Sequence, residues 1–286
     1  MSWIPKIPLG DVVESGIEYL TLHCAFITKA LSATMESGIQ GLTAGLLSVP
    51  PVVFIAAVAA LAWYLSGRKI ALMSILGMLF IWNLDLWDAT ISTIALVLIA
   101  TMCSIVVGMP SGILAAFFPR FRRIVMPVLD FMQTMPAFVY LIPAIPFFGL
   151  GPVSAVFTTV IFAMPPAIRL TCLGISQVPF EYIEAADAFG ATRMQKLFKI
   201  QLPMAAPTIM AGINQTIMLA LSMVVIAAMI GAKGLGGEVW KAIQRFNPGM
   251  GFEAGVAVVI VAIILDRITQ NIRSFKKREF AQSKRF

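Results

Sequence analysis

Residues 181–203 read EYIEAADAFGATRMQKLFKIQLP, and they place acidic and then basic side chains between two long apolar stretches. Pro179 suits the first turn of a helix, because proline needs no amide partner there, and the acids that follow complement the positive end of the helix dipole. The sequence therefore predicts a short helix from about Pro179 to Phe189. Gly190 follows it and can adopt a positive φ angle.

A second helix follows this glycine in the prediction. Thr192 can cap its first turn, and Lys196 and Lys199 lie toward its negative end. Pro203 is expected to close this helix and to open the next apolar segment. Residues 179–203, called the elbow below, are thus predicted to form a helix, a glycine turn and a helix.

The surroundings of the elbow are those of a membrane protein. The chain has 286 residues, of which 59% are hydrophobic and only 12% charged, and its mean hydropathy is +0.90. A soluble domain carries about 25% charged residues. The net charge of +7 does not indicate nucleic-acid binding, because the bases lie at the ends of apolar runs and not in a stripe with aromatic residues.

The residues that usually build metal or disulfide sites are sparse. Cys24, Cys103 and Cys172 are far apart in the sequence, and His23 is the only histidine. This spacing fits neither a disulfide framework nor a metal site. We therefore predict no metal and no cofactor bound by this chain.

About seven segments are long and apolar enough to be candidate transmembrane helices, which predicts an all-α membrane protein. They are Leu46 to Leu65, Ile70 to Leu84, Thr90 to Phe118, Ile124 to Phe148, Val153 to Leu173, Met204 to Ile230 and Phe252 to Ile272. The fourth contains four prolines and the fifth contains the pair Pro165 and Pro166, so both are predicted to be kinked or broken.

The distribution of bases predicts the orientation in the membrane. With the N-terminus outside and the C-terminus inside, most Lys and Arg residues fall on the inner side, as the positive-inside rule requires. The bases left outside are Lys6, Lys29, Lys233, Lys241 and Arg245. This N-out, C-in topology places the elbow in the cytoplasm, between the fifth and sixth spans.

Two segments outside the spans have helical patterns. Apolar residues from Val13 to Met35 recur in alternating steps of three and four, which predicts an amphipathic helix in the outer interface or, alternatively, one packed on a partner. Residues 234–251 predict a turn, a short helix and a second turn.

The expected organisation is residues 1–45 as the outer amphipathic segment, 46–85 as two peripheral spans, 86–272 as the core with its elbow, and 273–286 as a basic tail.

The spacing within the elbow is more specific than its charge. It runs Glu184-Ala185-Ala186, three residues, Gly190, nine residues, Ile200, one residue and Leu202-Pro203. This pattern matches the "EAA" loop of permease subunits of binding-protein-dependent ABC importers. Residues 106–151, 163–192 and 225–244 also resemble segments of the glycine betaine and proline betaine branch, and the likeness covers about Thr90 to Ile272.

The resemblance implies a type I importer core similar to that of the methionine permeases, in the cytoplasmic membrane of a bacterium. It implies a second permease copy, most simply a homodimer, a cytoplasmic ATPase and an external solute-binding protein as partners. ATP and Mg would bind the ATPase, and this chain has no G-x-x-x-x-G-K-[ST] loop of its own. The elbow would then be a coupling helix in a groove of the ATPase, and the cargo would be a quaternary ammonium osmoprotectant.

Two charges near the inner ends of the fourth and fifth spans need partners. Asp130 and Arg169 are expected at similar depth, so an ion pair would offset the cost of burying either of them. A structural pair, a gate and direct solute contact all remain open for these two. Candidate residues for the lining of a translocation path in the fourth span are Phe131, Met132, Met135, Phe138, Tyr140 and Phe147. For each of them a position facing the lipid or the core of the bundle is the alternative.

Three other readings of the sequence remain. The cargo of an ABC permease could instead be choline, carnitine, proline or another amino acid. An ion-coupled secondary transporter would need embedded carboxylates and commonly repeated halves. An intramembrane enzyme would need a paired acid and base, a metal cluster or an activated nucleophile, and the sequence has no such constellation.

Overall fold

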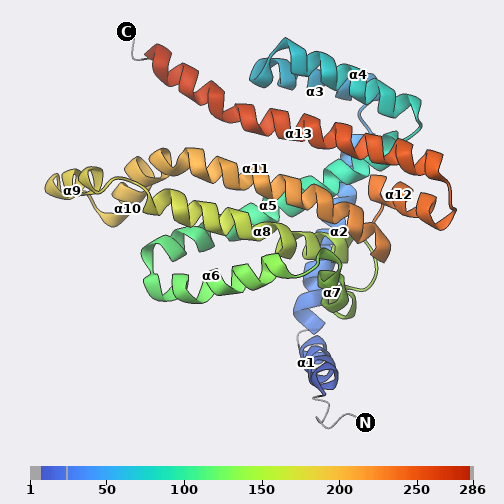
Figure 1. Cartoon of the computed structure of the whole chain (residues 1–286), viewed down its shortest axis with the longest axis horizontal. Coiled ribbons are helices and arrows are strands. Elements are labelled where there is room, and N and C mark those ends of the chain that lie inside the picture. The colour runs from blue at the N-terminus through green and yellow to red at the C-terminus, as the bar shows by residue number, and fades with distance from the viewer. Residues whose placement is uncertain (1–7, 24, 284–286) are drawn as a thin grey trace.

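The computed structural model describes residues 8–23 and 25–283, and helices connected by short turns make up this part of the chain (Figure 1). The elements in chain order are α1 Leu9–His23, α2 Ala25–Leu47, α3 Pro51–Ser66, α4 Arg68–Asn83, α5 Trp87–Phe117, α6 Pro119–Thr134, η1 Ala137–Tyr140, α7 Leu141–Phe148, α8 Pro152–Ser176, α9 Phe180–Ala188, α10 Arg193–Lys196, η2 Leu197–Gln201, α11 Leu202–Ala227, η3 Ala228–Ile230, α12 Leu235–Gln244 and α13 Pro248–Ser283.

The centre of the bundle is α8, which packs along both α5 and α11. Small residues allow these helices to approach closely. A Cβ added at Gly112 of α5 would lie 2.6 Å from the carbonyl oxygen of Ile168, and one at Gly212 of α11 would lie 2.9 Å from the Cβ of Leu170. Because such distances leave no space for a side chain, the positions of α5, α8 and α11 relative to one another are closely constrained.

A second layer of helices covers one side of this centre. The hairpin of α3 and α4 packs against α13, and Ile55, Met78 and Ile264 belong to its shared buried cluster. Ser66 at the end of α3 donates a hydrogen bond of 2.8 Å to the carbonyl oxygen of Arg267. The hairpin is therefore attached to the bundle through α13.

The segment before the first span forms two helices and not the single amphipathic helix that the sequence predicted. α1 ends at His23 and α2 begins at Ala25, and Cys24 lies outside the described residues. α2 runs across the bundle near the end that carries α7 and α12 (Figure 1), and its axis makes an angle of 97° with α3. The interfacial placement predicted for this segment stays a prediction.

The number of spans that the structure supports is lower than predicted. Within the described residues four helices are long and apolar enough to cross a membrane, and six if two sharply bent pairs each count as one span. The bent pairs are α2 with α3 and α6 with α7. The remaining predicted segment is α4, which has 16 residues and packs along α3. The seventh crossing therefore stays a prediction.

The prolines of the fourth and fifth spans have different effects. The fourth span is broken as predicted, since α6 and α7 are separated by η1 and meet at 113°. The fifth span remains one helix, α8, although Pro165 and Pro166 lie inside it. Both of these prolines are buried between neighbouring helices, and this packing holds α8 together where proline removes its internal hydrogen bonds.

Candidate functional site

The elbow has the local structure that its sequence predicted. α9 ends at Ala188, and Gly190 adopts a φ angle of +73°, which a residue with a side chain rarely does. The amide of Gly190 donates to the carbonyl oxygen of Asp187 over 2.9 Å, and the amide of Ala191 donates to that of Ala186 over 2.9 Å. These bonds close the end of α9 and turn the chain toward α10.

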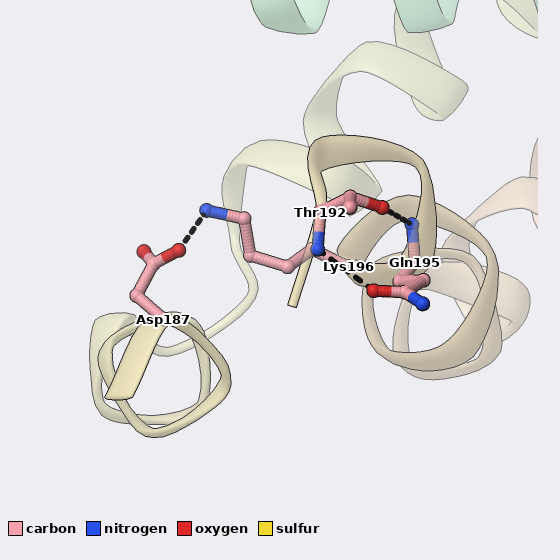
Figure 2. Close-up of polar contacts among 4 residues, drawn as sticks. All are labelled: Asp187, Thr192, Gln195 and Lys196. Carbon is pink, nitrogen blue, oxygen red and sulfur yellow. Dashed lines mark hydrogen bonds and ion pairs between the residues drawn. The ribbon is translucent and has the colours of Figure 1, made fainter. Parts of the chain in front are cut away.

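The second helix begins with a complete capping box (Figure 2). The amide of Gln195 donates to Thr192 Oγ1 over 3.3 Å, and the amide of Thr192 donates to Gln195 Oε1 over 2.8 Å. The predicted cap at Thr192 is confirmed. Lys196 Nζ also lies 2.5 Å from Asp187 Oδ1, which joins the two sides of the turn. The elbow is thus a defined shape and not an irregular loop.

The base of the elbow differs from the prediction at Pro203. Instead of ending there, the helix continues from α10 through the π-helical turn η2 into α11. Pro203 lies in the first turn of α11, where its missing amide is tolerated through the wider π turn. Leu197 packs in a buried cluster with Ile175 of α8 and Ala205 of α11. The elbow is therefore an extension of the central bundle.

The residues of the predicted coupling motif lie along the projecting part and its base. Figure 1 shows α9 extending beyond the end of the bundle. Glu184, Ala185 and Gly190 are exposed, and a Cβ added at Gly190 would meet no atom within 4 Å. Ala186 is buried beneath them. At the base, Pro203 is exposed and Ile200 and Leu202 are half-buried.

The structure brings Asp130 of α6 and Arg169 of α8 together. Arg169 Nη2 lies 2.6 Å from Asp130 Oδ1, and the two side chains are 37% and 64% exposed in the isolated chain. This ion pair joins the broken fourth span to the central helix. Neither side chain is fully covered by the isolated chain itself.

The six candidate lining residues of the fourth span have unequal surroundings. Phe131 and Phe138 are exposed, and Met132, Met135 and Phe147 are half-buried. Tyr140 is only 8% exposed and belongs to the main buried cluster. Five of the six are therefore exposed or half-buried in the isolated chain, whereas Tyr140 lies in the packed interior.

A polar cluster between α11 and α13 was not found from the sequence. Asn214 Nδ2 donates to Asp266 Oδ1 over 3.0 Å, and Thr269 Oγ1 donates to Asn214 Oδ1 over 2.8 Å. Gln270 Nε2 also donates to Asp266 Oδ1, over 2.7 Å. The signal available in the sequence was Asp266 inside the predicted seventh span, an expensive position for an unpaired acid.

Metal binding has no support among residues 8–23 and 25–283. His, Cys, Asp and Glu side chains form no group of three or more there that could hold a metal ion. The main features of the described residues are instead the elbow, which projects from one end of the bundle, and the broken fourth span, whose halves α6 and α7 lie beside the central helices. Such an arrangement fits transport across a membrane better than chemistry on a bound group.

Comparison with known proteins places this arrangement in a class. The family model described as "Binding-protein-dependent transport system inner membrane component" matches residues 108–275. The chain belongs to this family. It is therefore a multi-pass inner-membrane protein with a transport role, and the family description implies a solute-binding protein and an ATPase as its partners.

Individual relatives are similar over nearly the whole chain. The glycine betaine transport system permease protein OpuAB of Bacillus subtilis is 53% identical, over 97% of this chain and 98% of its own. The glycine betaine/carnitine transport permease protein GbuB of Listeria monocytogenes is 49% identical, over 96% of this chain and 99% of its own. The glycine betaine/proline betaine transport system permease protein ProW of Escherichia coli is 47% identical, over 93% of this chain and 75% of its own.

A solved structure supports the fold independently. The MetNI methionine ABC transporter in an inward-facing conformation matches with a TM-score of 0.59 at 23% sequence identity, covering 63% of this chain and 90% of that one. The predicted all-α, type I importer core is thereby confirmed. At this identity the likeness concerns the fold alone.

Proposed function

We propose that the chain is the permease subunit of an ATP-driven importer for glycine betaine and closely related quaternary ammonium osmoprotectants. The observation that carries this proposal is the 53% identity to a glycine betaine permease over 97% of the chain. The elbow projects from the bundle and has exposed small residues and defined caps. These features support its role as a contact site for another protein.

The proposed complex divides the work among several chains. An external solute-binding protein selects the cargo, two permease copies form the path, and a separate ATPase binds ATP and Mg beneath the elbows. Permease subunits of this kind carry no cofactor of their own. Closure of the ATPase dimer moves the two elbows together, and the continuous helix from α10 into α11 carries that motion to the path.

The distribution of bases supports the elbow as the cytoplasmic end. The elbow carries Arg193, Lys196 and Lys199, and the turn between α5 and α6, which is followed by Arg120, Arg122 and Arg123, lies toward the same end of the bundle (Figure 1). A concentration of bases marks the cytoplasmic side of membrane proteins. The N-terminus would then lie outside and the C-terminus inside.

The translocation path is proposed to run beside the broken fourth span. Phe131, Met135 and Phe138 offer apolar and aromatic surface there, and aromatic faces attract quaternary ammonium ions. The ion pair of Asp130 and Arg169 would hold α6 against α8 in one conformation. Its separation would let α6 move while α8 stays in place.

The test is reconstitution into liposomes with the cognate ATPase and solute-binding protein, followed by uptake of labelled glycine betaine. We expect uptake that requires ATP and both partners, and that excess unlabelled proline betaine reduces. Uptake driven by a proton or sodium gradient without the ATPase would contradict the proposal and favour the secondary transporter.

Other cargoes for the same machinery are separated by competition. Relatives at 30–38% identity carry names for trimethylamine N-oxide, carnitine and choline transport, so unlabelled forms of these solutes belong in the same assay. An excess of proline or another amino acid is expected to leave betaine uptake unchanged. A stronger effect of an amino acid than of unlabelled betaine would instead support an amino-acid permease.

A further inference from the structure

The end of α6 leaves a carbonyl group without its usual helical partner. In a continuous helix the carbonyl oxygen of Met132 would accept from the amide of residue 136. Residue 136 is proline, which has no amide hydrogen, and Met135 before it is held in the extended conformation with ψ of 137°. Pro136 thus both ends α6 and removes the donor that Met132 would otherwise have.

Tyr140 supplies a replacement donor from the far side of the break. Its hydroxyl donates a hydrogen bond to the carbonyl oxygen of Met132, across η1. The hydroxyl therefore joins the last turn of α6 to the segment that leads into α7. Backbone carbonyls that the fold shields from solvent nearly always have a hydrogen-bond partner, so this part-buried contact has a clear physical cause.

The ring of Tyr140 is fixed to the central bundle at the same time. It packs edge-on against Phe162 of α8, with ring centroids 5.8 Å apart and an angle of 72° between the planes. The side chain is 8% exposed and lies in the main buried cluster, whereas Phe131 and Phe138 on either side of the break are exposed. The side chain of this η1 residue thus contacts both α6 and α8.

A second side-chain hydrogen bond at the end of α6 shows what distinguishes Tyr140. The carbonyl of Phe131 accepts from Thr134 Oγ1 over 2.9 Å, within the same helix and at an exposed position. Water can replace the threonine hydroxyl there, and the bond crosses no break in the chain. The bond from Tyr140 is part-buried and spans the 113° bend.

We propose that Tyr140 is a positioning residue for transport: its hydroxyl holds the bend between α6 and α7, and its ring sets that bend relative to α8. Phe138 and Met135 are thereby presented to the path in one orientation. This inference rests on the proposed function for its transport readout only. The bend itself can be measured without any solute.

The central variant is Tyr140→Phe, which keeps the ring and removes the hydroxyl. Leaving the Met132 carbonyl unsatisfied is expected to lower the maximal uptake rate by about tenfold, while the half-saturating concentration of loaded binding protein stays unchanged because that step occurs outside. Tyr19→Phe on α1 is the matched control, since it removes an exposed tyrosine hydroxyl; uptake should stay at the wild-type rate.

Pro136→Ala tests the cause of the effect. It restores an amide at position 136, which can donate to Met132 once Met135 turns from the extended into the helical conformation, so the tyrosine hydroxyl becomes redundant for that carbonyl. In this background Tyr140→Phe should change uptake by less than about twofold, because the carbonyl has another partner. If Tyr140→Phe alone fails to assemble, Pro136→Ala should restore assembly. The proposal would be overturned if Tyr140→Phe lowered uptake by the same factor with and without Pro136→Ala. It would also be overturned if Pro136→Ala failed to restore the assembly of a Tyr140→Phe protein that does not assemble.

A distance measurement separates this inference from the proposed function. Spin labels at the exposed positions Ile124 of α6 and Ile142 of α7 report the bend in the purified complex. We expect one narrow distance distribution in the wild type and a broadened one in Tyr140→Phe, whether or not the wild type transports betaine. An unchanged distribution in Tyr140→Phe would refute the role of the hydroxyl even if betaine uptake is confirmed.

Discussion

The central bundle and the elbow both depend on small residues, but those residues have opposite surroundings. Gly112 and Gly212 lie where another helix of the same chain occupies the space that a side chain would need. Gly190 and Ala185 lie where the chain itself contributes little or nothing to cover them. The difference indicates that small residues in the bundle serve packing within the chain, whereas those of the elbow leave room for a second protein.

The largest effect is expected in the bundle. Gly112→Val would place a branched side chain against the Ile168 carbonyl and the Cβ of Thr171, at 2.6 and 2.7 Å from the new Cβ. Because backbone cannot yield as a flexible side chain does, we expect loss of folded protein, at a cost of about 3 kcal/mol or more. Thermal unfolding in detergent, followed by size-exclusion chromatography, measures it.

Gly255→Val is the matched control, since a Cβ at Gly255 meets nothing within 4 Å. It should retain the wild-type elution profile and nearly the wild-type melting temperature. A Gly112→Val protein as stable as Gly255→Val would show that the bundle is less closely packed than described.

The next effect is expected in the elbow, and on transport more than on folding. Gly190→Val has space for its side chain but places a β-branched residue at a φ angle of +73°, which costs about 1–3 kcal/mol. The turn should therefore shift, with loss of ATPase copurification and of uptake while the bundle stays folded. Gly190→Asn should retain most activity, because asparagine tolerates this conformation. Equal uptake by Gly190→Val and wild type would remove the elbow from the mechanism.

A smaller effect is expected where the broken fourth span meets the bundle. Asp130→Asn and Arg169→Gln each remove one partner of the 2.6 Å ion pair. A double-mutant cycle on uptake should give a coupling of at least about 0.2–1 kcal/mol, which is the range for such pairs in water. The charge exchange of both residues should recover part of the lost rate. Strictly additive effects would mean that the pair has no part in transport.

The smallest effect on transport is expected at the cap of α10, because the change is confined to one local turn. Thr192→Ala removes the oxygen that accepts from the amide of Gln195, at a cost of about 1 kcal/mol to the local helix. Amide hydrogen exchange in residues 192–196 should accelerate by about fivefold at that cost, and Thr192→Ser should restore the wild-type rate. Unchanged exchange in Thr192→Ala would indicate that contacts at the base, and not the cap, hold this turn.

The sequence predicted best what depends on neighbours along the chain. The positive φ of Gly190 and the cap at Thr192 follow from local stereochemistry, and both are present. Asp130 and Arg169 were predicted to lie at similar depth, near the inner ends of the fourth and fifth spans. That position was enough to predict the ion pair that they form.

Features that depend on distant packing could not be predicted in the same way. Pro165 and Pro166 leave α8 continuous because of helices that enclose them, and periodicity does not show those helices. The hydrogen bond from Asn214 to Asp266 joins residues 52 positions apart. Tyr140 was predicted as a candidate lining residue because it is aromatic and lies in the broken fourth span, but its ring is buried in the structure.

The most direct test of the elbow's role compares two phenylalanines that differ in place and not in exposure. Phe189 in the elbow is 90% exposed, and Phe246 in the turn between α12 and α13 is 94% exposed. A photoreactive phenylalanine analogue at each position, in the active complex, should cross-link the ATPase from position 189 and not from position 246. An ATPase adduct from position 246, or none from position 189 in a complex that still transports, would contradict the account.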